Sequence, residues 1–153
     1  MQKIASFTVN HDTITTGMYI SRVDGDVVTY DIRMRLPNCG EYLPNATMHT
    51  FEHLFATFAR NSAFGKDVIY VGPMGCRTGF YLLVRDTLSH ENAISLVQQC
   101  FDKIANFEGE IPGAKKEECG NYLEHDLSGA KALGKQMVDI LKGYTVEKLV
   151  YPK

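Results

Sequence analysis

The chain has 153 residues, 44% of them hydrophobic and 22% charged, which is typical of one globular domain, so residues 1–153 are expected to form a single domain. Its formal net charge of −2 excludes the broad basic surface that binding to nucleic acid or to an anionic membrane requires. No stretch approaches the ~18 apolar residues of a membrane span, and the start has no secretory signal pattern, so we expect a cytoplasmic location.

Two pairs of β-strands are predicted, over residues 18–22, 27–36, 66–71 and 80–85. Asp24-Gly25 separates the first two strands and is a strong signal for a hairpin turn. Hydrophobic and polar residues alternate along the second strand, so one of its faces is expected to be buried. The other face carries Asp31, Arg33 and Arg35, and we expect it to be open.

Three helices are predicted, over residues 46–64, 90–107 and 129–141, with Asn45, Ser89 and Ser128 as their N-terminal caps. The second and third helices each carry a stripe of apolar residues at helical spacing. Paired strands interleaved with amphipathic helices predict an α+β fold, in which the helices pack on one face of an antiparallel sheet.

The first predicted helix contains an H-x-x-E-H motif, formed by His49, Glu52 and His53. Four residues are close to one helical turn, so the two histidines lie on the same face, at the spacing that lets two imidazoles bind one transition metal. Glu52 lies beside them, where it can act as a general acid or base without being a ligand. We therefore interpret this segment as a metal-binding helix.

The opposite face of this helix is apolar, with Phe51, Leu54, Phe55 and Phe58, and it is predicted to be core. The face with the histidines has two interpretations. It is either a solvated face that carries two histidines by chance or a metal face, and we favour the metal face.

A catalytic metal usually has a third protein ligand and one open position. The candidates are the cysteines, His125 and several acidic residues. Cys119 lies in a loop-like segment between the second and third helices, and a thiolate there makes a His₂Cys site that suits zinc or ferrous iron. Taken alone, Cys119 is equally well explained as a small buried hydrophobic residue.

A second thiol, Cys76, lies in a loop with three glycines, which can bring its side chain against a ligand. The neighbouring Arg77 is a cation of the kind that favours thiolate. The alternative is a tight hairpin with an inert cysteine, and the local sequence does not separate the two. Cys39 and Cys100 are interpreted as structural residues without a catalytic or ligand role.

Taken together, these segments make the chain similar to the S-ribosylhomocysteine lyase family, the LuxS-type autoinducer-2 production proteins. The resemblance covers nearly the whole length. It is carried by S-F at 6–7, His11, Y-D-I-R at 30–33, P-N at 37–38, H-T-F-E-H-L at 49–54, P-M-G-C-R-T-G-F-Y at 73–81, C-G at 119–120, H-D-L at 125–127 and G-A-K at 129–131. H-x-x-E-H is shared with peptidases, whereas the block around Cys76 is far more specific.

The resemblance implies a homodimeric α+β enzyme with its active sites at the subunit interface. It implies one divalent metal per subunit, held by His49, His53 and Cys119, with Fe(II) as the native ion and Zn(II) or Co(II) as working substitutes. It further implies that Cys76 and Glu52 are the catalytic acid and base.

The same resemblance implies that Ser6, His11 and Arg33 line the substrate pocket. From the residues alone, Arg33 is equally well explained as a strand arginine paired with Asp31, and Ser6 and His11 as ordinary polar residues. His125 matches a histidine that recurs in the family, and no role is assigned to it.

The implied reaction cleaves S-ribosylhomocysteine to homocysteine and 4,5-dihydroxy-2,3-pentanedione, the precursor of the quorum-sensing signal autoinducer-2. The sugar carbonyl migrates from C1 to C3, and β-elimination then expels homocysteine thiolate. A metal with an open position acts as a Lewis acid. A cysteine thiolate can move carbon protons, and a carboxylate near the metal can move protons among the oxygens.

The chain departs from the family pattern at one place. Many members have D-I-S before P-M-G-C, whereas this chain has Tyr70-Val71-Gly72. A phenol thus replaces an acid, and glycine replaces serine. The change bears on any substrate contact that the acid makes, and it leaves the metal ligands and Cys76 intact.

Two other functions compete with the lyase. In an H-x-x-E-H metallopeptidase, Glu52 activates a metal-bound water, but the third ligand is usually a carboxylate and Cys76 has no use. In a structural zinc module, Cys76 closes a four-ligand site, which has no exchangeable position.

Overall fold

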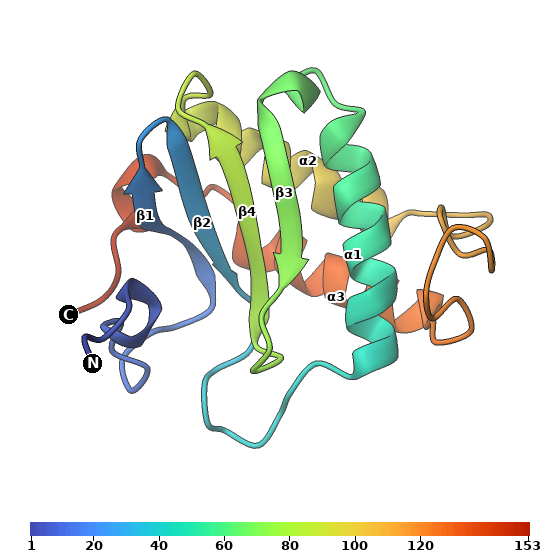
Figure 1. Cartoon of the computed structure of the whole chain (residues 1–153), viewed down its shortest axis with the longest axis horizontal. Helices are drawn as coiled ribbons and strands as arrows, with labels where there is room; N and C mark the ends of the chain where they lie inside the picture. The colour runs from blue at the N-terminus through green and yellow to red at the C-terminus, as the bar shows by residue number, and fades with distance from the viewer.

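The computed structural model describes residues 1–153 and shows two layers, an antiparallel sheet and three helices that cover one of its faces (Figure 1). The strands are β1 (Gly17–Asp24), β2 (Val27–Arg33), β3 (Val68–Pro73) and β4 (Gly79–Arg85). The helices are α1 (Asn45–Arg60), α2 (His90–Ala105) and α3 (Leu127–Ile140). Short 3₁₀ turns are formed at Ala5–Phe7, Gly65–Asp67 and Val146–Leu149. The predicted α+β arrangement is confirmed.

The sheet order is β1-β2-β4-β3, and every neighbouring pair is antiparallel. The predicted hairpin is present, since Asp24 pairs with Val27 and Gly25 has a φ of 59°, a left-handed conformation that glycine adopts without strain. Strand β2 is followed by α1, so the chain crosses the helix layer before it returns to the sheet at its far edge as β3. This crossing places α1 over the β3 side of the sheet (Figure 1).

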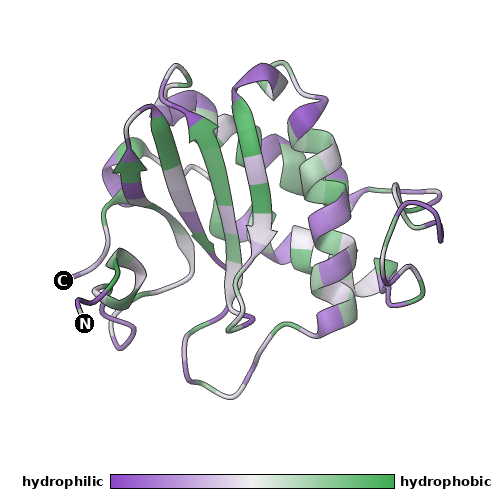
Figure 2. Cartoon of the chain, viewed as in Figure 1, coloured by the Kyte–Doolittle hydropathy of each residue, from purple (hydrophilic) through white to green (hydrophobic).

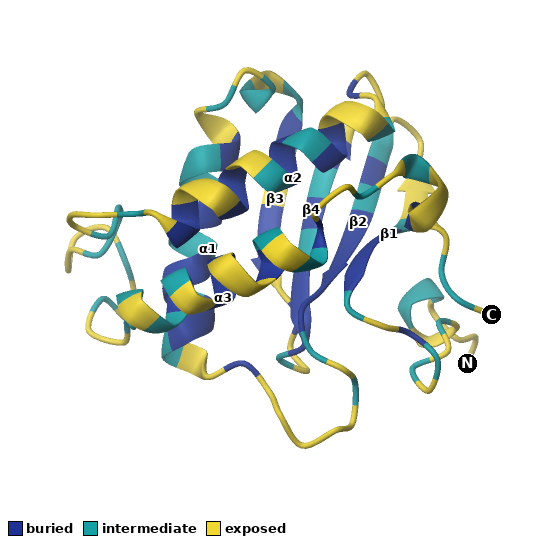
Figure 3. Cartoon of the chain, turned by 180° about the vertical axis from the view of Figure 1, so that it is seen from behind, coloured by how far each residue is buried: buried dark blue, intermediate teal, exposed yellow.

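The core lies between the sheet and the helices. Figure 2 shows that the strands are mostly hydrophobic, and Figure 3 shows that the helices bury the faces turned to the sheet and expose the others. Phe51 and Phe55 of α1 meet Phe80 of β4 and Phe101 of α2, with ring centroids 5.0 to 6.4 Å apart. Burying each such side chain stabilises the fold by about 2 to 3 kcal/mol. The apolar stripe of α1 therefore fixes which way its histidine face points.

Several predicted boundaries move by a few residues. Helix α1 ends at Arg60 rather than at residue 64, because the side chains of Asn61 and Ser62 bond to the carbonyls of Thr57 and Ala59 and compete with further helical bonds. The predicted cap Asn45 is wrong, since it is already the first helical residue and the cap position belongs to Pro44.

Of the caps predicted for the other two helices, one is confirmed and one is wrong. Ser89 caps α2 as predicted, accepting a hydrogen bond from the backbone N–H of Asn92. The cap of α3 is Asp126 instead of Ser128, and its side chain accepts from the N–H of Gly129 at 2.9 Å. None of the helices combines the length and apolar character that a membrane crossing requires.

Candidate metal centre and active site

Helix α1 presents His49 and His53 on its partly exposed face, away from the sheet. Their rings meet edge to face, with centroids 4.6 Å apart. This geometry follows from the four-residue spacing, which stacks the two side chains one turn apart while Phe51 and Phe55 are anchored in the core. The predicted metal face of the helix is therefore formed.

Each of these histidines bonds to a backbone carbonyl through Nδ1. His49 donates to the carbonyl of Glu124 at 2.7 Å, and His53 donates to the carbonyl of Pro112 at 2.8 Å. A carbonyl oxygen only accepts, so both rings carry their hydrogen on Nδ1 and leave the Nε2 lone pair free. Such bonds fix the tautomer and orientation of histidines that bind metals.

The free Nε2 atoms face the thiol of Cys119. Its Sγ atom lies 3.3 Å from Nε2 of His49 and 3.9 Å from Nε2 of His53. Metal–sulfur and metal–nitrogen bonds of ordinary length in a tetrahedral site place these atoms about 3.6 Å apart, between the two observed distances. Two imidazoles and one sulfur thus have the spacing that a single tetrahedral ion requires.

The segment that carries Cys119, residues 106–126, is tied to α1 by buried threonines. Thr47 donates to the Asp126 carboxylate at 2.9 Å, and Thr50 accepts from the backbone N–H of Asp126 at 2.8 Å. Together with the two histidine–carbonyl bonds, these contacts hold the 106–126 loop on the outer side of α1 (Figure 1). The site is therefore preformed by contacts that need no ion.

His125 joins the same cluster, although no role was predicted for it. The ligand atoms of His49, His53, Cys119 and His125 all lie within 4.8 Å of one another. The ring of His125 stacks on that of His49, with centroids 4.1 Å apart at 18°. Its Nδ1 atom contacts the Thr50 hydroxyl at 2.9 Å, and its buried Nε2 atom has no partner.

Burial lowers the pKa of His125, and the neighbouring His49 and His53 lower it further. The His125 ring is in direct contact with the ring of His49, one of the candidate ligands. Two signals in the sequence mark this position, its place among the candidate third ligands and its match to a histidine that recurs in the family.

Glu52 lies between the two histidines on α1, is partly exposed, and is not a member of the cluster. This is the position expected of a proton carrier that is not a ligand. The cluster contains no carboxylate. It therefore lacks the third ligand that an H-x-x-E-H peptidase usually has.

Cys76 lies in the turn between β3 and β4 and is exposed. It is outside the cluster that can hold an ion, which removes the closed zinc module with Cys76 as fourth ligand. Its Sγ atom contacts the Thr78 hydroxyl at 3.0 Å. The guanidinium of Arg77 lies over the ring of Tyr42 and donates to the carbonyl of Leu43, so it is held by that neighbouring loop.

The face of β2 that carries Asp31 and Arg33 was expected to be open, but it is buried at the end of the strand. Asp31 and Arg33 are 1% and 2% exposed and form an ion pair at 2.6 Å. Tyr151 from the C-terminal segment donates to Asp31 at 2.7 Å and stacks on Tyr19. The alternation along β2 could not reveal this cover, because it comes from a residue 120 positions later.

Ser6 and His11 lie in the N-terminal segment that precedes β1. Ser6 helps to line a cavity of about 250 Å³ on the open face of the sheet, together with Tyr81 of β4. His11 contacts the carbonyl of Val9 through Nδ1. Figure 1 shows this segment at one end of the molecule and the 106–126 loop at the other. One chain alone therefore does not bring Ser6 and His11 to the metal cluster.

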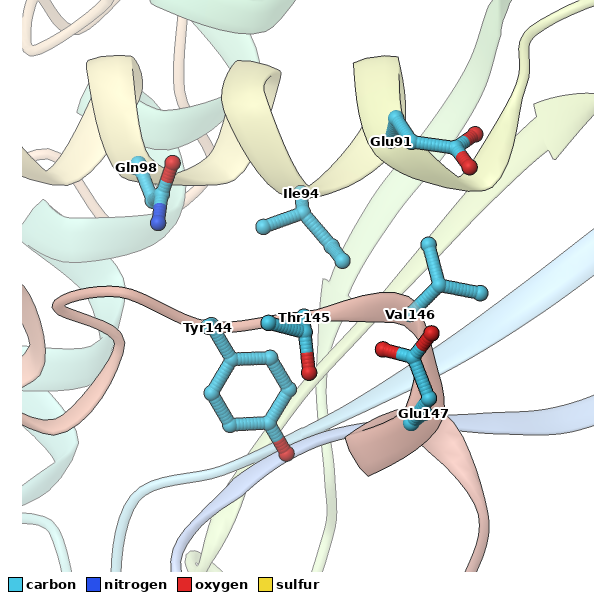
Figure 4. Close-up of a pocket in the computed structure, with 7 residues that line it drawn as sticks. All are labelled: Glu91, Ile94, Gln98, Tyr144, Thr145, Val146 and Glu147. Carbon is cyan, nitrogen blue, oxygen red and sulfur yellow. The ribbon is translucent and has the colours of Figure 1, made fainter.

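A larger cavity, of about 360 Å³, lies between α2 and the C-terminal segment (Figure 4). It is lined by Glu91, Ile94, Gln98, Tyr144, Thr145, Val146 and Glu147. None of the predicted site residues lines it, and it has no member of the metal cluster. The candidate active site is the cluster on α1, and this cavity is separate from it.

Known proteins are similar to this chain over nearly its whole length. The family model described as S-ribosylhomocysteinase (LuxS) matches residues 4–147. S-ribosylhomocysteine lyase of Clostridium acetobutylicum is 46% identical over 158 aligned residues, with both chains covered completely. The lyases of Clostridium beijerinckii and Phocaeicola vulgatus are 46% and 45% identical, over 99% of this chain.

The match covers nearly the whole chain and includes the segments of α1, of the β3–β4 turn and of the 106–126 loop. The His₂Cys cluster that the fold assembles lies within it. The chain belongs to the S-ribosylhomocysteinase (LuxS) family.

Proposed function

We propose that this protein is a carbon–sulfur lyase that cleaves S-ribosylhomocysteine to homocysteine and 4,5-dihydroxy-2,3-pentanedione. Family membership supports the substrate, since the similar proteins are named for it. The observation that carries the mechanism is the meeting of Cys119 with His49 and His53, while a second thiol, Cys76, stays outside the ligand set.

One divalent ion per chain is proposed to bind Nε2 of His49, Nε2 of His53 and Sγ of Cys119. Imidazole and thiolate donors suit Fe(II), Zn(II) and Co(II), and we expect Fe(II) natively with the other two as substitutes. When bound, such an ion supplies Lewis-acid polarisation of the sugar carbonyl. The 106–126 loop keeps the three donors in place, and three protein ligands leave one coordination position for substrate.

The proton transfers are assigned to Cys76 and Glu52. Cys76 takes a proton from one sugar carbon and returns it to the next, which moves the carbonyl along the chain. Glu52 moves protons among the sugar oxygens. With the ketone at C3, Glu52 removes the C4 proton, and the electron pair forms the C4–C5 double bond as the C5–S bond breaks. Homocysteine leaves as the thiolate.

The substrate pocket is proposed to lie between two chains of a homodimer, lined by Ser6, His11 and Arg33. The placement of the N-terminal segment and the 106–126 loop at opposite ends of one chain supports this (Figure 1). Ser6 and His11 can reach a metal cluster only if that cluster belongs to a partner. Arg33 is buried, so it would contribute from beneath the pocket surface.

Residues 1–153 are proposed to form one lyase domain. A cytoplasmic location is proposed from the chemistry of the cysteines, because all four are free and one of them is assigned to proton transfer as a thiol.

The lyase assignment is tested by homocysteine release from S-ribosylhomocysteine, detected with a thiol reagent, on anaerobically purified protein with its metal content measured. Activity that scales with bound metal is expected. Peptide cleavage by the same preparation, with no thiol released, would contradict the assignment.

The shared site is tested by mixing two inactive variants, His11→Ala and Cys119→Ala. If each site takes His11 from one chain and the metal from the other, a mixed dimer has one intact site. Random exchange of subunits should then restore about a quarter of the wild-type activity. No recovery, with mixed dimers demonstrated by mass spectrometry, would place both residues in one chain's site.

A further inference from the structure

Tyr151, near the C-terminus, contacts a buried carboxylate of the sheet. Its hydroxyl donates to Oδ2 of Asp31 at 2.7 Å, and the same oxygen accepts from Nη2 of Arg33 at 2.6 Å. A carboxylate only accepts, so the phenol is the donor. Burial and the charge of Asp31 raise the pKa of Tyr151, so the phenol keeps its hydrogen at neutral pH.

These two donors determine how the Asp31 carboxylate is oriented. Its other oxygen, Oδ1, is buried and makes no hydrogen bond, so the group is held through Oδ2 alone. The torsion about the Cβ–Cγ bond of an aspartate is broad, and it does not by itself fix the carboxylate. Without the phenol of Tyr151, the bond from Arg33 would be the one hydrogen bond left to orient this group.

Arg33 depends on this carboxylate for its own orientation. Two nitrogens of its planar guanidinium are held, Nη2 by Asp31 and Nη1 by the hydroxyl of Thr78 at 2.8 Å. Its Nε atom is buried and has no partner. A movement of the Asp31 carboxylate therefore alters one of the two contacts that set the plane of the guanidinium.

The ring of Tyr151 is itself held in place. It stacks on the ring of Tyr19 in β1, with centroids 5.0 Å apart at 22°. The hydroxyl of Tyr19 donates to the carbonyl of Thr15 at 2.9 Å, which fixes the lower ring of the stack. The phenol of Tyr151 is thus presented to Asp31 by a rigid neighbour.

Two anchors precede Tyr151 in the C-terminal segment. Leu149 is fully buried in the core. The hydroxyl of Tyr144 accepts from the N–H of Met18 at 3.0 Å and donates to its carbonyl at 2.8 Å, at the edge strand β1. Neither anchor involves Asp31, so Tyr144 is a matched control, a phenol of the same segment that holds only the backbone of β1.

We propose that Tyr151 is a positioning residue, which acts through Asp31 to hold the guanidinium of Arg33 in the orientation that the substrate pocket requires. Tyr151 lies beyond residues 4–147, which the family model matches, so that match assigns it no role. The consequence for catalysis rests on the proposed function, in which Arg33 lines the pocket. The hold on Arg33 does not rest on it.

Nuclear magnetic resonance of the Arg33 side chain tests this hold without substrate, in protein loaded with Zn(II), which is diamagnetic. The two Nη nitrogens exchange places when the guanidinium rotates, and line shapes give the rate. Rotation should be about tenfold faster in Tyr151→Phe than in the wild type, and within about twofold of the wild type in Tyr144→Phe. Equal rates in the wild type and in Tyr151→Phe would overturn the proposal.

Steady-state kinetics provides the second test. Tyr151→Phe should raise KM for S-ribosylhomocysteine about tenfold and leave kcat within about twofold, because a binding contact is weakened. Tyr144→Phe should leave both constants within about twofold. Each variant should lower the midpoint of thermal unfolding by about 2 to 6 °C. A role in stability alone would change unfolding in both variants and KM in neither, and that result would contradict the proposal.

The two tests separate this inference from the lyase assignment. Faster rotation of Arg33 in Tyr151→Phe, with no homocysteine released by the wild type, keeps the positioning role and loses the proposed function. Homocysteine release with the same KM in the wild type and in Tyr151→Phe keeps the function and loses the positioning role. If Tyr151→Phe does not fold, the wild type still decides, because a bond to a buried carboxylate slows exchange of the Tyr151 hydroxyl hydrogen with water. A hydrogen that exchanges too fast to be observed would overturn the proposal.

Discussion

The Sγ atom of Cys119 lies 3.3 Å from the Nε2 atom of His49, a residue 70 positions earlier in the chain. Hydrogen bonds made by neighbouring residues bring these two atoms together. The Nδ1 bond of His49 to the carbonyl of Glu124 turns the ring, and the bonds of Thr47 and Thr50 to Asp126 bring the loop to the helix. The metal site is thus a product of how the 106–126 loop docks on α1.

Removing the thiol should remove the metal. Cys119→Ala leaves two imidazoles, which do not hold a catalytic ion firmly, so bound metal should fall from about one per chain to near zero. Metal analysis after gel filtration measures this, with Cys39→Ala as the matched control that keeps its metal. An unchanged metal content in Cys119→Ala would remove this residue from the ligand set.

His125 is expected to strengthen metal binding without being a ligand itself. His125→Phe keeps a flat ring stacked on His49 and removes both nitrogens, so metal affinity should fall about tenfold, the lower end of effects outside the ligand set. Titration with Zn(II) against a competing chelator gives the affinity. A loss as complete as in Cys119→Ala would make His125 a ligand.

Replacing Glu52 should separate binding from catalysis. Glu52→Gln keeps the size of the side chain and cannot exchange a proton, so metal content should be unchanged. Homocysteine release should fall by about 10² to 10⁴. Full turnover by this variant would assign the proton transfers elsewhere.

The cap of α3 should stabilise both the fold and the site. Asp126→Ala removes the bonds from Gly129 and Thr47 and should lower the free energy of unfolding of metal-free protein by about 1 kcal/mol. Ser128→Ala, at the position that sequence favoured, should change it by less than about 0.5 kcal/mol. Urea unfolding of the two variants side by side tests this, and equal effects would count against the assigned cap.

The same contribution should depend on pH. The bond from Gly129, followed by that from Thr47, lowers the pKa of Asp126 below its ordinary value of 3.8. The stabilisation is therefore fully present above that value and is lost as the pH falls through the lower pKa of the folded state. The stability difference between wild type and Asp126→Ala should shrink only in strong acid, and a difference that already disappears by neutral pH would contradict this.

Tyr70 and Gly72, the two substitutions at the place where the chain departs from the family pattern, are in contact with each other. The ring of Tyr70 lies over Gly72, where a Cβ atom would be 2.4 Å from the ring. Gly72→Ser should therefore cost about 1 to 2 kcal/mol in the wild-type chain and much less together with Tyr70→Asp. Thermal unfolding of the single and double variants gives the coupling. The rate of homocysteine release by Tyr70→Asp is a second measurement. A large gain in that rate would establish that the phenol of Tyr70 slows the enzyme.

Sequence determined those features that depend on short spacing. The period of a helix places His49 and His53 on one face and the phenylalanines on the other, and the alternation in β2 and the Asp-Gly turn set the hairpin. The resemblance to the family added the distant ligand Cys119, which spacing alone left among several candidates.

Tertiary structure decided what depends on contacts between distant segments. Asp126 is the cap because its second oxygen is held by Thr47 of α1, whereas Ser128 has no such partner. Tyr151 from the C-terminal segment bonds to Asp31, which in turn pairs with Arg33, and His125 of the 106–126 loop stacks on His49 of α1. Local pattern carries no information about these contacts, since each one is set by the packing of loops and termini onto a finished core.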